Sequence, residues 1–277
     1  MLEMNLTRLY ELSVLLYALS VSLYFIDFLH HNRKANRIAF WLLSIVWVFQ
    51  TAFFLFRIVE TKRFPILTMS EGLYFYAWVL ITLSLAINRL LRVDFIVFFT
   101  NVLAFFILAL HTFAPIRQPS EAAAEKLISE LLMIHITMAI LAYGAFSLSF
   151  VFSVLYMIQY HLLKQKKWGK RLWRMADLTK LEKMSYVLNL IGLPMLLLGL
   201  ILGVIWAYIK IEHFHWYDAK VLGSFSVLLV YSVYFYKRVV QEMYGKALAL
   251  WNIGSFLFLL VNFFLFGSLS KFHLWYS

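Results

Sequence analysis

The chain has 277 residues, of which 63% are hydrophobic, 19% aromatic and only 14% charged. A soluble protein of this length cannot bury so much apolar surface, so we expect an all-α, polytopic integral membrane protein with about eight transmembrane helices. The sequence holds no cysteine, which excludes thiol–disulfide chemistry, thiolate ligation of metals and structural zinc sites built on cysteine.

Eight apolar runs are candidates for crossing a bilayer, which takes roughly 20 residues. The first run has one arginine and no small-residue cleavage pattern before it, so we expect it to be retained as a helix. No repeat or low-complexity linker interrupts the chain, and residues 1–277 are expected to form a single transmembrane domain. The expected spans are Leu9–His30, Ile38–Phe56, Leu73–Ile87, Phe95–Leu110, Leu131–Tyr160, Tyr186–Tyr208, Val221–Tyr236 and Ala247–Phe266.

The distribution of the net charge of +11 predicts the orientation in the cell membrane. The two tails and the even-numbered connections carry 9 of the 25 basic and 9 of the 14 acidic residues, so the whole excess lies on the other side. The positive-inside rule makes that other side cytoplasmic and places both termini outside. Membrane orientation thus explains the positive net charge, and no nucleic-acid partner is needed to account for it. The basic connection KQKKWGKRLWR (164–174) is expected to set orientation, with binding of anionic lipid or a cytoplasmic partner as the alternative.

One acidic residue, Asp27, lies within the first apolar run. An acid inside a span is costly and often functional. Because the basic segment HHNRK follows within a few residues, we expect the carboxylate of Asp27 to snorkel to the cytoplasmic interface instead.

The densest group of histidine and aromatic residues is the stretch GVIWAYIKIEHFHWYDAK, from Gly203 to Lys220, on the expected outer side. Histidine ligates both haem iron and zinc, and the surrounding rings suit a flat macrocycle better than a bare ion. Belts of Trp and Tyr are also ordinary at membrane interfaces, so a stretch without any ligand is the alternative. Five of the eight histidines lie at or near expected outer ends: His111, His135, His213, His215 and His273.

Three blocks, in this order, resemble the cytochrome c assembly family of membrane proteins, of the CcsA/ResC and HemX kind. They are KRFPILTMSEGLYFYAW (Lys62–Trp78), ELLMIHITMAILAYGAFSLSF (Glu130–Phe150) and the stretch from Gly203 to Lys220, followed by FGSLSKFH near the C-terminus. The resemblance covers most of the chain and implies capture of haem on the outer face, with His135 and His273 as axial ligands of the iron. It also implies that Trp206, Asp218 and Lys220 keep positions of the family's tryptophan-rich loop.

The same loop supplies three further candidate cofactor-binding residues, His213, His215 and Trp216. The two histidines share a face if the loop is extended, and diverge by about 200° if it is helical. Asp218 is expected to form an ion pair with Lys220 rather than to orient His215. Lys220 or Lys271 is expected to pair with a propionate of the haem.

The chain departs from the synthetase members of the family at several positions of the loop. Isoleucine, histidine and tyrosine replace expected tryptophans, alanine and valine replace a proline and a glutamate, and a tyrosine stands where a transmembrane histidine is expected: Ile211, His215, Tyr217, Ala219, Val221 and Tyr236. These departures favour the HemX branch, which the family links to regulation of haem biosynthesis through the level of glutamyl-tRNA reductase. The expected partners are haem, membrane lipid, and either other cytochrome c assembly subunits or a cytoplasmic haem-biosynthesis enzyme.

Two other functions stay open from the sequence. One is a CcsA/ResC-like subunit of a haem-attachment complex, and the other is a haem-free membrane regulator or scaffold that acts through the basic connection. A secondary transporter is disfavoured, because such proteins use broken helices and intramembrane charges, whereas only Pro194 interrupts a span here. No nucleophile–base pair, phosphate-binding glycine loop or carboxylate pair is found, so we do not expect an enzyme.

Overall fold

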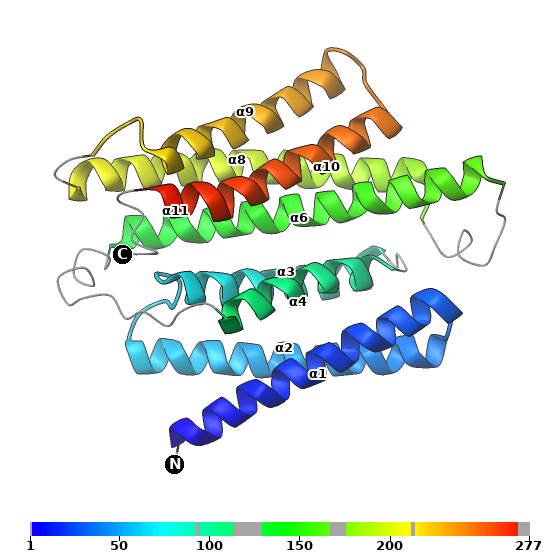
Figure 1. The fold of residues 1–277 in the computed structure, drawn as a ribbon, viewed down its shortest axis with the longest axis horizontal. Coiled ribbons are helices and arrows are strands. Elements are labelled where there is room, and N and C mark those ends of the chain that lie inside the picture. Colours follow the sequence, from blue (N-terminus) through cyan, green and yellow to red (C-terminus); the bar gives the residue numbers. More distant parts are fainter. Residues whose placement is uncertain (1, 92–94, 114–128, 167–175, 212–213, 271–277) are drawn as a thin grey trace. The chain divides into compact units, whose positions relative to one another are not determined.

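The computed structural model describes residues 2–91, 95–113, 129–166, 176–211 and 214–270, and every regular element among them is helical (Figure 1). The elements are α1 (Leu2–His30), α2 (Arg33–Thr61), α3 (Met69–Leu91), α4 (Ile96–Phe113), α6 (Glu130–Lys164), α8 (Leu178–Lys210), α9 (Ala219–Val239), α10 (Lys246–Val261), the π-helix η1 (Asn262–Phe266) and α11 (Gly267–Leu269). In this described part, seven helices are long and apolar enough to cross a membrane, and α4 is a shorter apolar helix. The predicted polytopic all-α fold is confirmed.

Two helices are much longer than a bilayer requires. α6 has 35 residues and α8 has 33, whereas roughly 20 suffice to cross the hydrocarbon core. The corresponding expected spans, Leu131–Tyr160 and Tyr186–Tyr208, stop short of the charged residues on either side. The helices continue because lysine, glutamate and leucine are strong helix formers in water as well as in lipid.

The helices form two compact units. The first contains α1, α2, nearly all of α3, and α4; the second contains residues 66–69, α6, α8, α9, α10, η1 and α11. In the first unit, α1 packs along α2 and also contacts α4. A buried polar chain connects its helices: Tyr17 Oη donates to Asn101 Oδ1 (2.8 Å), and Asn101 Nδ2 donates to Ser84 Oγ (2.9 Å). Such bonds hold helices together where lipid offers no partner.

The structure corrects the expectation for Asp27. Its side chain does not snorkel to an interface: the residue is only 1% exposed, and Asn36 Nδ2 donates to its Oδ2 at 2.8 Å. Asn36 lies in the first turn of α2, and the tight α1–α2 connection carries it back to the end of α1. The carboxylate is therefore a buried acceptor that helps to join the two helices.

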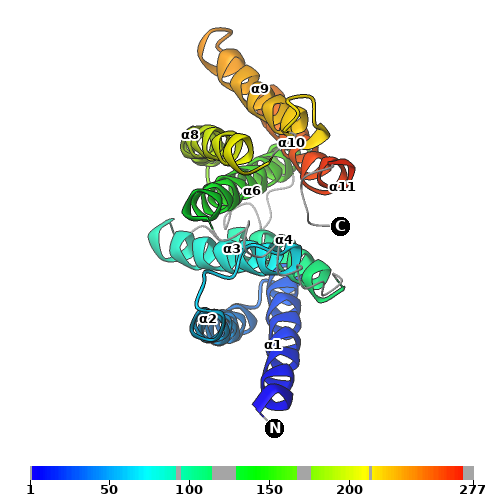
Figure 2. The same cartoon turned by 90° about the vertical axis from the view of Figure 1, so that its left-hand side faces the viewer.

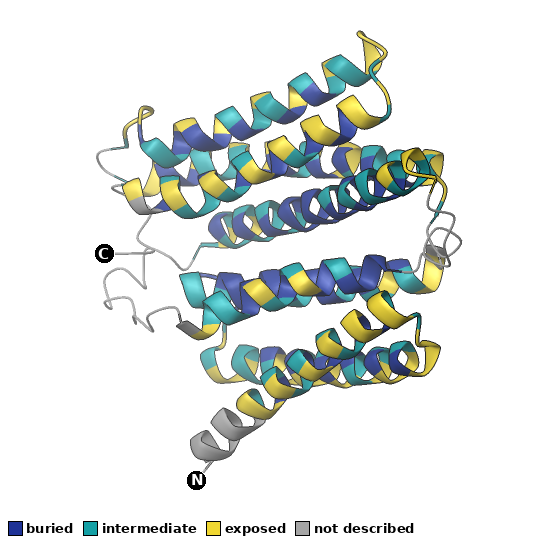
Figure 3. Cartoon of the chain, turned by 45° about the vertical axis from the view of Figure 1, so that its right-hand side comes forward, coloured by how far each residue is buried: buried dark blue, intermediate teal, exposed yellow. Residues whose placement is uncertain are grey.

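In the second unit, α6 packs against α8 and α10, while α9 packs against α8 and α10 (Figure 2). α6 is the most buried of the candidate spans, with 72% of its most apolar window buried. Figure 3 shows the buried residues along this helix. Gly192 of α8 permits a close approach, because a Cβ atom there would lie 2.8 Å from Phe146 Cε1 of α6. Small residues let transmembrane helices pack backbone to backbone in this way.

A polar cluster joins α6, α8 and α10 in the interior of the second unit. Asn252 Nδ2 donates to Ser149 Oγ and to Ser153 Oγ, both at 2.8 Å, and Asn189 Nδ2 donates to Asn252 Oδ1 at 2.8 Å. All four residues are buried. The amide of Asn252 is thus the centre of the cluster.

Replacing Asn252 by leucine should destabilise the protein by about 1–3 kcal/mol, because an apolar side chain of similar size removes the donor to Ser149 and Ser153 and the acceptor for the buried amide of Asn189. Denaturant unfolding in detergent micelles, followed by circular dichroism, measures this loss. Ser232→Ala is the matched control, since that exposed hydroxyl bonds only within its own helix. Equal stabilities of Asn252→Leu and the control would contradict the assignment.

Candidate functional site

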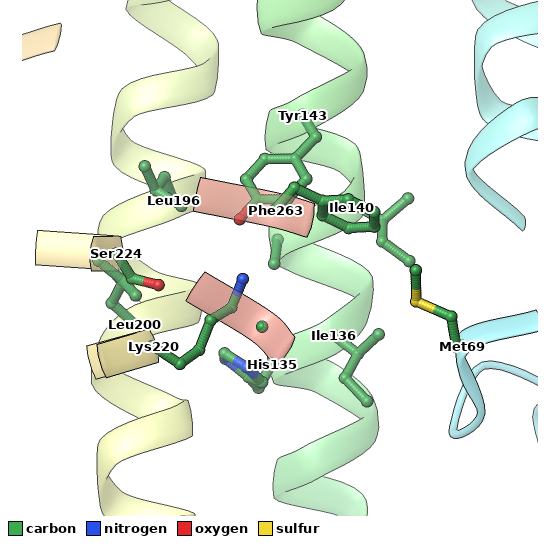
Figure 4. Close-up of a pocket in the computed structure, with 12 residues that line it drawn as sticks. Met69, His135, Ile136, Ile140, Tyr143, Leu196, Leu200, Lys220, Ser224 and Phe263 are labelled. Carbon is green, nitrogen blue, oxygen red and sulfur yellow. The ribbon is translucent and has the colours of Figure 1, made fainter. Parts of the chain in front are cut away.

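A pocket lies in the second unit, where α6 and α9 begin and α10 gives way to η1 and α11 (Figure 4). Most of its walls are apolar. The lining residues are Met69, His135, Ile136, Ala139, Ile140, Tyr143, Leu196, Leu200, Lys220, Ser224, Phe263 and Gly267.

The α6 wall of the pocket follows from helical spacing. His135, Ala139 and Tyr143 stand at i, i+4 and i+8, so they share one face of the helix. The small side chain of Ala139 leaves space between the imidazole and the phenol ring. The pocket therefore has one ring at each end of this wall, as Figure 4 shows.

The imidazole of His135 is partly buried and is fixed by a backbone group. Its Nδ1 lies 2.5 Å from the carbonyl oxygen of Gly199 on α8. A carbonyl oxygen can only accept a hydrogen bond, so Nδ1 carries the proton and donates. In the neutral imidazole the other ring nitrogen, Nε2, then holds a lone pair, which is the form of histidine that ligates metals.

Lys220 places a positive charge in the pocket from the first turn of α9. Its Nζ donates to the carbonyl oxygen of Asn262 (3.3 Å) and lies 5.7 Å from the centre of the Phe263 ring. The expected ion pair with Asp218 is wrong. The Asp218 carboxylate caps α9 and accepts from the backbone amide of Lys220 (2.8 Å), as helix-capping aspartates do.

No carboxylate of the described residues lies within 4.0 Å of the ammonium group of Lys220. A buried or partly buried ammonium without a counter-ion favours an anionic ligand. Figure 4 shows this group extending into the space between His135 and the rings of Tyr143 and Phe263. The pocket can thus hold a molecule that is apolar over most of its surface and carries an acid group.

The π-helix η1 forms the third wall. π-helical turns are rare and occur frequently at functional sites. Here the turn supplies the Phe263 ring and the carbonyl of Asn262, while Gly223 of α9 lets the two elements touch: a Cβ atom at Gly223 would collide with the Asn262 side chain and lie 3.0 Å from Phe266 Cγ. The close approach positions Lys220, one turn earlier on α9, beside η1.

The other candidate residues either do not line the pocket or lie outside the residues that the structure describes. The stretch from Gly203 to Lys220 is not one loop, because its first part completes α8 and its last residues start α9. Trp206 is 9% exposed within α8 and does not line the pocket. His215 and Trp216 are exposed, in edge contacts with neighbouring rings. His213, Lys271 and His273 lie outside the described residues.

Several lining residues were missed by the sequence analysis, among them Tyr143, Ser224 and Phe263. Each is an ordinary residue of an apolar helix, so nothing in its local sequence marks it. The Gly199-x-x-x-Gly203 spacing on α8 is different, since this spacing is a known signal of close helix packing in membranes. It would have pointed to the partner surface of α6.

The donors present fit haem better than a bare metal ion. Within the described ranges, no three His, Cys, Asp or Glu side chains gather as a metal ion would require. The pocket instead offers one imidazole lone pair, one ammonium group and apolar walls with two aromatic rings. Haem needs an axial imidazole, an apolar slot and a partner for its acid groups, and this set matches those needs.

Comparison with known proteins agrees with the resemblance. Residues 66–274 match the model of the family described as cytochrome C assembly protein. The chain is 64% identical to protein HemX of Bacillus subtilis (strain 168) over the full length of both, and 44% identical to protein HemX of Brevibacillus brevis over 97% of this chain and 98% of that one. The cytochrome c biogenesis protein CcsA of Mesostigma viride is 24% identical over 68% of each chain. The chain belongs to the cytochrome c assembly protein family.

Proposed function

We propose that this chain is a haem-binding membrane protein of the HemX type, which acts in cytochrome c assembly or in regulating haem biosynthesis through the level of glutamyl-tRNA reductase. The observation that carries the proposal is the pocket that combines the His135 imidazole, whose Nδ1 bonds to the Gly199 carbonyl, with the ammonium group of Lys220 between apolar walls. The high identity to two proteins named HemX supports this branch over the CcsA branch.

The residues of the chain would hold haem in defined roles. His135 Nε2 would bind the iron, the rings of Tyr143 and Phe263 would lie against the macrocycle, and Lys220 would pair with a propionate. By resemblance to the family, His273 would supply a second imidazole to the iron. When bound, haem supplies an iron centre. Its absorption spectrum and reduction potential depend on which residues ligate the iron. We place this site on the outer side of the cell membrane, with both termini outside, as the charge distribution predicts.

The spectrum of the purified full-length protein tests the proposal. Protein loaded with haem should show the Soret band of low-spin, bis-histidine iron, and His135→Ala and His273→Ala should each shift and weaken it. His161→Ala is the matched control: His161 is an exposed histidine of α6 whose Nδ1 bonds to the Met157 carbonyl of its own helix (2.8 Å). Its spectrum should equal that of the wild type.

An unchanged Soret band in both His135→Ala and His273→Ala would refute the ligand assignment. In that case, the haem-free regulator is tested by neutralising the basic residues of segment 164–174. Loss of the regulatory effect on glutamyl-tRNA reductase level, with both histidines dispensable, would establish that alternative.

A further inference from the structure

Two glycines of α8 surround the ring of His135. The carbonyl oxygen of Gly199 accepts from His135 Nδ1, and a Cβ atom on Gly203 would lie 2.6 Å from both Nδ1 and Cε1 of the same ring. Real Cβ atoms do not approach other atoms so closely. The imidazole therefore occupies the space that a side chain at position 203 would fill.

The spacing of the two glycines has a geometric reason. In an α-helix, the amide of residue i bonds to the carbonyl of residue i−4, and the Cα–Cβ bond tilts toward the N-terminus. A side chain at position 203 would thus project over the carbonyl of Gly199, which lies one turn earlier. With glycine at 203, that carbonyl is uncovered and can accept a second hydrogen bond from another helix.

We propose that Gly199 and Gly203 form a backbone receptor that positions His135 for iron. The Gly199 carbonyl fixes the tautomer with the proton on Nδ1, and the absent side chain of Gly203 allows the ring to lie against α8. Together, the hydrogen bond and the space at Gly203 leave Nε2 as the ring nitrogen that carries the lone pair. The two glycines are positioning residues, and this role rests on the proposed function of His135 as a haem ligand.

The receptor also tunes the ligand. A histidine ligand that donates its second N–H to a carbonyl becomes a stronger base toward the metal, and such outer partners typically change metal affinity by 10- to 100-fold. Hydrogen bonding to the axial ligand also sets the reduction potential of haem. Loss of the Gly199 contact should therefore weaken haem binding and raise the potential of the haem that remains.

A double-mutant cycle tests the receptor in the full chain. Gly203→Ala should weaken haem binding by about 10-fold or more, whereas Gly254→Ala, a helical glycine with nothing within 4 Å of an added Cβ, should not. Haem titration in detergent gives the affinities, and potentiometry gives the midpoint potential. In the His135→Ala background, Gly203→Ala should change the affinity by less than about 2-fold, because the receptor acts only through the ring.

The arms of this cycle separate the inference from the proposed function. Equal losses from Gly203→Ala in both backgrounds would overturn the receptor and show a general packing effect. A wild-type affinity and potential in Gly203→Ala, while His135→Ala binds haem more weakly, would overturn the receptor and leave the function standing. Full haem binding in His135→Ala would overturn both.

A measurement on the unaltered chain covers the case in which Gly203→Ala does not fold. In haem-free protein labelled with ¹⁵N-histidine, the two ring nitrogens have distinct chemical shifts when protonated or not. The resonance that disappears in His135→Gln should show a protonated Nδ1 and an unprotonated Nε2. The opposite pattern, with the proton on Nε2, would overturn the receptor.

Discussion

Replacing Lys220 by glutamine is expected to weaken haem binding by about 10- to 100-fold, since a hydrogen bond to a charged group contributes about 1.5–3 kcal/mol. In the proposed function, the ammonium group meets a propionate in a pocket where its nearest polar contact is the Asn262 carbonyl. Glutamine keeps a donor and most of the length of the side chain. The variant therefore removes the positive charge and keeps most of the packing contacts of the side chain.

The dimethyl ester of haem makes this prediction specific. The ester has no acid group, so wild type and Lys220→Gln should bind it with equal affinity in a Soret titration. Lys237→Gln is the matched control, because Lys237 lies near the other end of α9, 4.7 Å from the Trp251 ring. An equal loss of haem and ester binding in Lys220→Gln would refute the charge pairing.

Phe146→Ala should destabilise the second unit by about 3–4 kcal/mol. The ring is fully buried and stacks on Tyr231, with centroids 3.8 Å apart and an interplanar angle of 19°. Gly192 covers its edge and has no side chain that can move into the space left behind. In lipid, where burial alone drives little association, this lost dispersion is most of the cost.

Chemical unfolding in micelles, followed by circular dichroism, measures the effect of Phe146→Ala. Phe225→Ala, on α9, is the control for loss of a phenyl ring, because Phe225 is 43% exposed. Its expected change is below about 1 kcal/mol. Similar losses in the two variants would show that the Phe146–Tyr231 stack is not a main packing contact.

The helices could be predicted from the sequence because lipid leaves the backbone little choice. Every amide in the bilayer core must bond within its own segment, so each long apolar run becomes a helix. The ends of α6 and α8 could not be predicted in the same way. Beyond the hydrocarbon core, water and helix propensity decide where a helix stops, and hydropathy carries no information on either.

The site was only partly visible in the sequence. His135 and Lys220 were named through resemblance to a family, and the structure places both in one pocket. Their contacts with Gly199 and Asn262 join residues far apart in the chain, which local patterns cannot reveal. The prediction for Asp27 was wrong for the same reason. Its basic neighbours are visible in the sequence, but the hydrogen bond from Asn36, on the next helix, is not.

The π-helix η1 has a consequence for the direction in which α11 faces. Each residue of an α-helix advances by about 100° around the axis, and the wider i→i+5 turn takes up an additional residue. α11, which begins at Gly267 in the pocket wall, is thereby turned relative to the direction that an unbroken α10 would give it. The direction in which α11 faces the pocket depends on how many residues η1 contains. Deleting one residue from η1 would therefore rotate α11 about its axis without changing any residue of α11 itself.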